Sequence, residues 1–89
     1  MIELPQPEIT IEILYFAHFG DLAGRRNETL RLPAGSTVGT LTAMLGARDK
    51  RLSDLIGYGR ASINAEWATL DSPLSDGDEV AFMPPMSGG

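Results

Sequence analysis

The chain has 89 residues, among them seven Lys or Arg, twelve Asp or Glu, one His and no Cys. A chain of this length forms one domain that buries only about 60–65% of the surface exposed in its unfolded form, so a deep, enclosed substrate pocket would be hard to build. The absence of Cys excludes disulfides, thiolate nucleophiles and metal sites built on sulfur, and the net charge of −5 argues against nucleic acid as a partner.

The charge is distributed unevenly along the chain. Residues 1–60 hold seven acidic and seven basic side chains, whereas residues 61–89 hold five acidic side chains and no basic one. An acidic C-terminal third favours a basic partner surface, although such a face also keeps a small domain in solution. The first residues are acidic and broken by proline, and no apolar run approaches the ~18–20 residues of a membrane span, so we expect a cytoplasmic protein without a membrane partner.

The first half of the chain predicts a hairpin followed by a helix. Residues 9–16 alternate with a period of two and are rich in β-branched side chains, which is typical of a strand, and residues 28–32 form a second strand after a loop or short helical turn. Ser36 or Thr37 caps the helix and Gly46 supplies its stop. The apolar residues that recur at helical spacing are Val38, Leu41, Met44 and Leu45.

The second half predicts a short turn and three short strands. The turn ends at a Gly-Tyr-Gly sequence, residues 57–59, and residues 61–64 and 67–70 are candidate strands. An Asp-Gly-Asp turn leads into the last strand, residues 79–83, which a Pro-Pro pair ends because proline donates no ladder hydrogen bond.

This element order, ββαβ(β)β, predicts an α+β domain with one main helix on one face of a mixed sheet. The long crossover after the hairpin permits a parallel pairing of the first and last strands, which is the β-grasp arrangement of ubiquitin-like domains. We therefore divide the chain into an N-terminal extension (1–8), a β-grasp domain (9–83) and a flexible C-terminal tail (84–89).

Candidate catalytic groups are few. His18 has no second His or Cys with which to bind a metal ion, and residues 57–59 hold only a bare Gly-x-Gly. The acidic run at residues 76–79 lacks the spacing of a calcium loop. The sequence therefore shows no metal site and no catalytic apparatus of its own.

The C-terminal tail offers a different kind of chemistry. It reads Pro84-Pro85-Met86-Ser87-Gly88-Gly89. The proline pair favours an extended backbone, so these residues can reach about 18–20 Å at about 3.3 Å each, and glycines without a Cβ can enter a narrow channel. The α-carboxylate of Gly89 can attack the α-phosphate of ATP, and the resulting acyl adenylate can accept sulfur and become a thiocarboxylate.

Strand alternation also predicts an apolar patch at the root of this tail. If the first and last strands are neighbours, Leu14, Phe16 and Met83 meet on the otherwise polar face of the sheet, and Trp67 extends the patch. Exposed apolar patches mark partner surfaces. The alternative is that flanking loops cover these side chains as a small satellite core.

These segments together resemble a known family: the small, sulfur-carrying subunits of molybdopterin synthase, within the MoaD/ThiS group of ubiquitin-like proteins. The similar segments are Leu-Tyr-Phe-Ala at 14–17, Thr-Val-Gly-Thr-Leu at 37–41, Ile-Asn at 63–64 and, most specifically, residues 73–89.

The resemblance implies that a ubiquitin-activating-enzyme-like adenylyltransferase, using ATP, adenylates Gly89 before sulfur is added, with Gly88 as its narrow lead. The tail then enters the large catalytic subunit, in a heterotetramer, and donates sulfur to cyclic pyranopterin monophosphate. The chain itself would bind no cofactor and would be a non-catalytic subunit of a sulfurtransferase complex. The residues that the resemblance assigns to partner binding are Phe16, Trp67, Met83, Pro84, Pro85, Met86 and Ser87.

Two alternatives remain open at this point. The same carrier chemistry could serve thiamine thiazole, cysteine or tRNA thiolation. The chain could instead be a ubiquitin-like protein modifier, or an interaction module with an inert tail.

Overall fold

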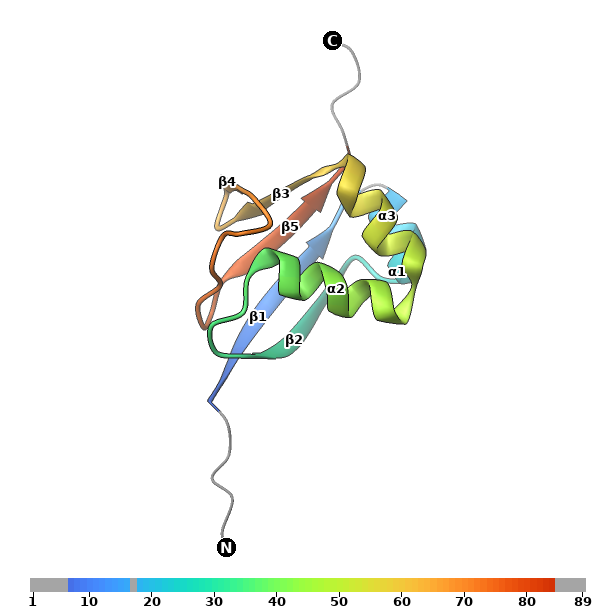
Figure 1. Ribbon diagram of the computed structural model, residues 1–89. Helices are drawn as coiled ribbons and strands as arrows, with labels where there is room; N and C mark the ends of the chain where they lie inside the picture. The colour runs from blue at the N-terminus through green and yellow to red at the C-terminus, as the bar shows by residue number, and fades with distance from the viewer. Residues whose placement is uncertain (1–6, 17, 85–89) are drawn as a thin grey trace, which may run out of the picture.

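A mixed five-stranded sheet with helices packed on one face forms the domain (Figure 1). The computed structural model describes residues 7–16 and 18–84. The strand order is β2-β1-β5-β3-β4. The elements are β1 (Glu8–Tyr15), α1 (His18–Ala23), β2 (Asn27–Pro33), α2 (Val38–Arg48), α3 (Lys50–Tyr58), β3 (Arg60–Ile63), β4 (Glu66–Ala68) and β5 (Glu79–Met83).

The parallel pairing of the first and last strands is confirmed. β1 lies beside β5 from Glu12, opposite Glu79, to Tyr15, opposite Phe82, while β1 and β2 form the expected antiparallel hairpin. The connection between the two central strands passes through α2 and α3 on the covered face of the sheet (Figure 1). The domain is therefore a ubiquitin-like β-grasp fold, as the element order predicts.

Helix α2 begins where the sequence predicts and ends later. The Thr37 hydroxyl accepts a hydrogen bond from the Thr40 amide, and the Thr40 hydroxyl accepts one from the Thr37 amide, which is a reciprocal capping box. The predicted stop at Gly46 is wrong, because the helix continues to Arg48. A Cβ on Gly46 would lie only 2.7 Å from Ser53 of α3, so the glycine allows two helices to approach and does not end one.

A second helix replaces the short turn expected after α2. Helix α3 is nine residues long, and its N-cap Asp49 accepts a hydrogen bond from the Arg51 amide. Gly57 lies inside its last turn, and the chain leaves the helix only at Gly59. The expected single main helix is therefore a pair, because the Asp49 cap outweighs the helix-breaking tendency of Gly57.

Two smaller expectations also change. Met44 was placed on the apolar face of α2 but is 39% exposed, because its position lies on the flank of the buried stripe. The strand expected at residues 67–70 occupies Glu66–Ala68. The chain turns at Thr69, whose amide donates to the Ser72 hydroxyl and whose carbonyl accepts from the Ser72 amide.

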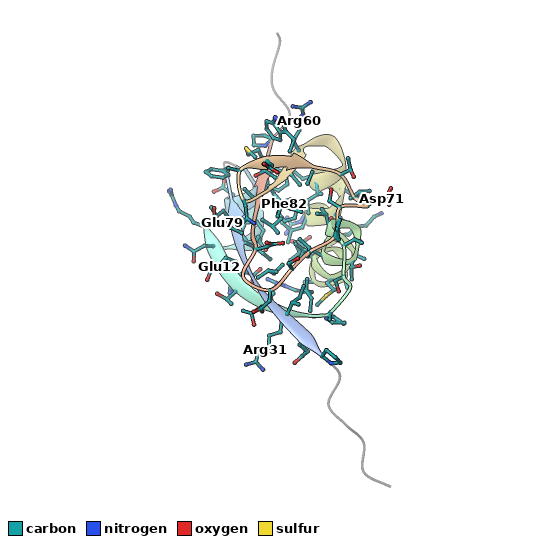
Figure 2. All side chains as sticks on the ribbon, turned by 90° about the vertical axis from the view of Figure 1, so that its left-hand side faces the viewer. Glu12, Arg31, Arg60, Asp71, Glu79 and Phe82 are labelled. Atoms are coloured by element: carbon teal, nitrogen blue, oxygen red, sulfur yellow. The ribbon has the colours of Figure 1, made fainter. Side chains whose placement is uncertain are left out.

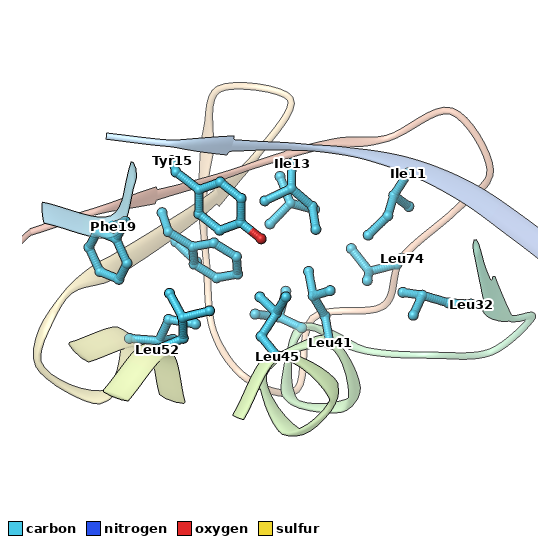
Figure 3. Close-up of a cluster of buried hydrophobic side chains, with 14 of the residues drawn as sticks. Ile11, Ile13, Tyr15, Phe19, Leu32, Leu41, Leu45, Leu52 and Leu74 are labelled. Atoms are coloured by element: carbon cyan, nitrogen blue, oxygen red, sulfur yellow. The ribbon is translucent and has the colours of Figure 1, made fainter. Parts of the chain in front are cut away.

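The core lies between the sheet and the helices (Figure 3). The odd-numbered residues of β1 from Ile9 to Tyr15 point into it, as the alternation predicts, and their neighbours on the other face do not. Tyr15 and Phe19 both stack on Phe82, at ring-centroid distances of 6.3 and 6.1 Å. These aromatic contacts fill the end of the core from which β5 leaves the domain.

A buried carboxylate joins three elements beside those aromatic rings. Glu28 of β2 accepts hydrogen bonds from the Tyr15 hydroxyl, from Arg48 of α2 at 2.9 Å and from Arg25 at 3.4 Å. Burial alone raises the pKa of Glu28, but the Tyr15 and Arg48 hydrogen bonds and the charges of the two arginines outweigh it, so the pKa lies below its ordinary value. Burial, together with the hydrogen bond to Glu28, raises the pKa of Tyr15.

Replacing this carboxylate should alter the acid dependence of stability. A carboxyl whose pKa is lowered on folding contributes stability at neutral pH. This contribution begins to decline near the ordinary pKa of about 4.3 and is lost as the pH falls through the lower pKa of the folded state. We expect Glu28→Gln to lower the free energy of unfolding at pH 7 by about 1–3 kcal/mol and to flatten its decline between pH 6 and 3. Urea denaturation across that range measures both effects, with the exposed Glu66→Gln as control. Parallel pH profiles for wild type and Glu28→Gln would contradict this account.

Candidate functional site: an apolar docking face at the root of the tail

The face of the sheet opposite the helices carries an open apolar cavity of about 330 Å³, here called the docking cavity. The side chains of β1, β3, β4 and β5, of the β3–β4 turn and of the residue after β1 form it. Its lining residues are Leu14, Phe16, Ser62, Ala65, Trp67, Glu79, Ala81 and Met83.

Strand register explains why these side chains meet. Leu14 lies opposite Ala81, Ala81 opposite Ser62, and Ser62 opposite Trp67, so one row of small and apolar residues crosses β1, β5, β3 and β4. The patch predicted from strand alternation is therefore present. Phe16 is 46% and Trp67 62% exposed, so flanking loops do not cover them as a satellite core.

Trp67 reaches the docking cavity through a tight hairpin. Asn64 and Ala65 connect β3 to β4 with positive φ angles of 50° and 70°, the backbone of a two-residue turn that suits the twist of a sheet. The Asn64 side chain fixes this turn to β5, since its oxygen accepts from the Glu79 amide and its nitrogen donates to Asp78. The only tryptophan of the chain is thus held at the edge of the sheet.

The root of the tail lies at the end of the docking cavity that Phe16 and Met83 line. Met83 ends β5, and the half-buried Pro84 follows it. The Phe16 amide donates to the Phe82 carbonyl, which continues the parallel pairing up to this point. The other predicted tail residues, Pro85, Met86, Ser87, Gly88 and Gly89, lie outside the described residues.

Three of the five acidic residues of the C-terminal third lie at or just before the start of β5, and they have two different roles. Asp76 accepts a hydrogen bond from the Thr10 amide, and Asp78 accepts from the Ser75 amide, so these two carboxylates hold the turn before β5. Glu79 is different, because its side chain is exposed at the border of the docking cavity, directly opposite Glu12 on β1. The negative charge beside the docking cavity therefore comes from Glu12 and Glu79.

Arg60 is a feature that the sequence did not indicate. Its guanidinium carbon lies 4.7 Å from the centre of the Trp67 ring, in a cation–π contact. Arg60 is two residues from Ser62, which faces Trp67, so the two side chains are diagonal neighbours across β3 and β4. The contact depends on a strand register that no local pattern in the sequence specifies.

Gly59 sets how closely α3 approaches the root of the tail. A Cβ on Gly59 would overlap the carbonyl oxygen of Met83 and lie 3.1 Å from Phe19 Cζ. Only glycine leaves room for this contact. The end of α3 therefore packs directly against the last residue of β5.

A pair of glycine substitutions tests this packing. We expect Gly59→Ala to lower the free energy of unfolding by about 1–3 kcal/mol, because the helix end or β5 must move away. Gly57→Ala is the matched control: it lies in the same helix, its Cβ would meet nothing within 4 Å, and alanine favours the helix by about 1 kcal/mol. Chemical denaturation compares the two variants, and equal effects would show that the close approach is unimportant.

The fold and this site define a class: a ubiquitin-like β-grasp domain with an exposed apolar face beside the start of its C-terminal tail. Small archaeal modifier protein 1 (SAMP1) from Haloferax volcanii has the same fold, with a TM-score of 0.76 and 30% identity over 90% of this chain and 99% of that protein. A subunit 1–subunit 2 complex of the molybdopterin-converting factor from Helicobacter pylori contains the fold as well, with a TM-score of 0.65 and 23% identity over 91% of this chain and all of the matched chain.

Sequence comparison then identifies the family. The ThiS family profile matches residues 13–89, and the chain belongs to the ThiS family. Among curated relatives, the molybdopterin synthase sulfur carrier subunit of Escherichia coli strain K12 is 35% identical over 82 residues, which cover 89% of this chain and 99% of that protein. Within residues 7–16 and 18–84, no helix has the length and apolar character to cross a membrane.

Proposed function

We propose that this chain is the sulfur carrier subunit of a molybdopterin synthase. The observation that carries the proposal is the docking cavity at the root of a tail that ends in Gly88 and Gly89. The Escherichia coli relative, named as such a subunit, supports it over nearly its full length. The Helicobacter pylori complex supports a partner of the subunit 2 type, the large catalytic subunit, in what we expect to be a heterotetramer.

The proposed chemistry takes place at the carboxylate of Gly89. An oxygen of that carboxylate attacks the α-phosphorus of ATP, pyrophosphate leaves, and an acyl adenylate forms on an adenylyltransferase. Hydrosulfide then attacks the carbonyl carbon, AMP leaves, and the terminus becomes a thiocarboxylate. In the large subunit the sulfur passes to cyclic pyranopterin monophosphate, and water restores the carboxylate of Gly89.

The domain's own part in this cycle is positional. Phe16, Trp67 and Met83 bind the apolar surface of a partner, and burying them supplies most of the binding free energy. Residues 84–89 then span about 18–20 Å from the docked face to the partner's active site. The residues that pass along the partner's channel are Pro84, Pro85, Met86 and Ser87. The two terminal glycines enter its narrowest part.

A second candidate function keeps the activated tail and changes its acceptor. The similarity to SAMP1 favours a protein modifier, in which the activated carbonyl of Gly89 is joined to the amine of a target lysine. Both functions need the adenylate, and they differ in whether sulfur or a lysine amine attacks it.

The chemistry can be tested by intact mass. We expect incubation with an adenylating partner, ATP and a sulfide source to raise the mass of the chain by the difference between one sulfur and one oxygen atom. The change should be located at Gly89. A variant lacking Gly89 should gain nothing, because the carboxylate then lies one residue short of the partner's active site. The same mass gain in that variant would refute the proposal, and lysine-linked conjugates without thiocarboxylate would favour the modifier function.

The docking role can be tested by binding. We expect Trp67→Ala to weaken binding to the large synthase subunit by more than tenfold, since exposed aromatic side chains at the centre of an interface are typical hot spots. Leu70→Ala is the matched control, because Leu70 is 57% exposed but does not line the docking cavity. Isothermal titration calorimetry gives both affinities, and unfolding should show that both variants keep wild-type stability. An equal loss in the two variants would argue against a specific docking face.

A further inference from the structure

The docking face carries a positive charge at the end from which the tail leaves. Arg60 opens β3 and lies opposite Met83, the last residue of β5. Its guanidinium rests over Trp67, at the border of the docking cavity. Figure 2 shows Arg60 at one end of the sheet, with Arg31 at the other.

The donors of this arginine are available to a partner. Within residues 7–16 and 18–84, the Arg60 side chain makes no hydrogen bond or ion pair, and the residue is exposed. A cation–π contact with an indole uses none of the N–H donors of the guanidinium, and five donors in a planar fork suit a carboxylate. The stacking also limits the side chain's freedom, so less entropy is lost when a partner group pairs with it.

Two carboxylates lie on the same face, farther from the tail than Arg60. Glu12 and Glu79 lie side by side on β1 and β5, and Figure 2 shows both between Arg60 and the far end of the sheet, where Arg31 lies. The Thr29 hydroxyl donates a hydrogen bond to Glu12, and Glu79 remains exposed beside it. Going away from the tail, the order along this face is therefore Arg60, the apolar cavity, the Glu12–Glu79 pair and then Arg31.

We propose that Arg60 is a specificity-determining residue that pairs with a carboxylate of the protein that receives the tail. Arg60 itself does not line the docking cavity, but a partner that covers Trp67 also comes over the guanidinium that lies on its ring. A guanidinium that is buried without an anion is strongly unfavourable. On the acceptor surface, an acidic group therefore lies beside the entry of the tail, and basic groups lie over Glu12 and Glu79. This arrangement fixes the direction in which the carrier docks, so that residues 84–89 point into the acceptor and not across its surface.

The basic partner surface expected from composition takes a more specific form under this proposal. The acidic C-terminal third predicted a basic partner surface, but two of its carboxylates hold a turn, and the tail itself leaves beside an arginine. A uniformly basic partner would meet Arg60 with a like charge at the tail entrance. The partner we infer carries both signs of charge in a defined order.

Charge reversal provides the test, which rests on the proposed function through its choice of the large synthase subunit as partner. We expect Arg60→Glu to weaken binding about tenfold or more at low salt, and the difference to shrink as salt rises, because rim charges act mainly on association. Arg60→Lys should retain most of the affinity, since it keeps the positive charge. Arg31→Glu is the matched control: the same charge change on the same exposed face, outside the docking cavity.

The outcomes separate the two proposals. No binding by the wild-type chain would refute the carrier function itself. Wild-type binding with unchanged affinity for Arg60→Glu would overturn the role of Arg60, and so would an equal loss in Arg31→Glu, which would show only a response to net charge. Thermal unfolding of each variant shows whether the domain stays folded. If Arg60 pairs with a carboxylate, the affinity of Arg60→Lys should depend on salt as that of the wild type does, whereas a loss of affinity that salt does not change would indicate a structural effect.

Discussion

The parallel pairing of β1 and β5 is the constraint on which the other features of the domain depend. Parallel neighbours need a long crossover, and α2 and α3 provide it while covering one face of the sheet. The same pairing places Leu14 beside Ala81 and brings Phe16 to the end of β5, so it creates the uncovered docking cavity as well as the core. One strand register therefore determines both what the domain buries and what it presents.

The aromatic end of the core and the root of the tail are also coupled. Tyr15 stacks on Phe82, and its hydroxyl donates a hydrogen bond to the buried Glu28. Arg48 of α2 forms an ion pair with the same carboxylate. Because Gly59 has no Cβ, the end of α3 can pack directly against Met83. Phe82 is thus packed in the core and Met83 lies against the end of α3, so the tail starts from a well-packed part of the domain.

Periodicity in the sequence predicted much of this arrangement. The alternation in β1 and β5 specified the core face and the apolar patch, because side chains on a strand point to opposite faces in turn. It could not specify contacts that depend on packing between elements. Gly46 is typical of a helix stop, yet it allows α3 to pack closely against α2. Glu28 is a charged residue in a strand, yet it is buried, with hydrogen bonds from Tyr15 and Arg48. The Arg60–Trp67 contact needed the β3–β4 register for the same reason.

The direction of β1 and β5 has a practical consequence for anyone who handles the protein. Because the two strands run side by side in the same sense, β1 starts at Glu8 at the end of the sheet opposite the one where β5 finishes at Met83. A purification handle, dye or surface anchor attached ahead of β1 is therefore kept a full strand length away from the docking cavity (Figure 1). The domain can be immobilised from that side with the end of β5 and the docking cavity facing the solution.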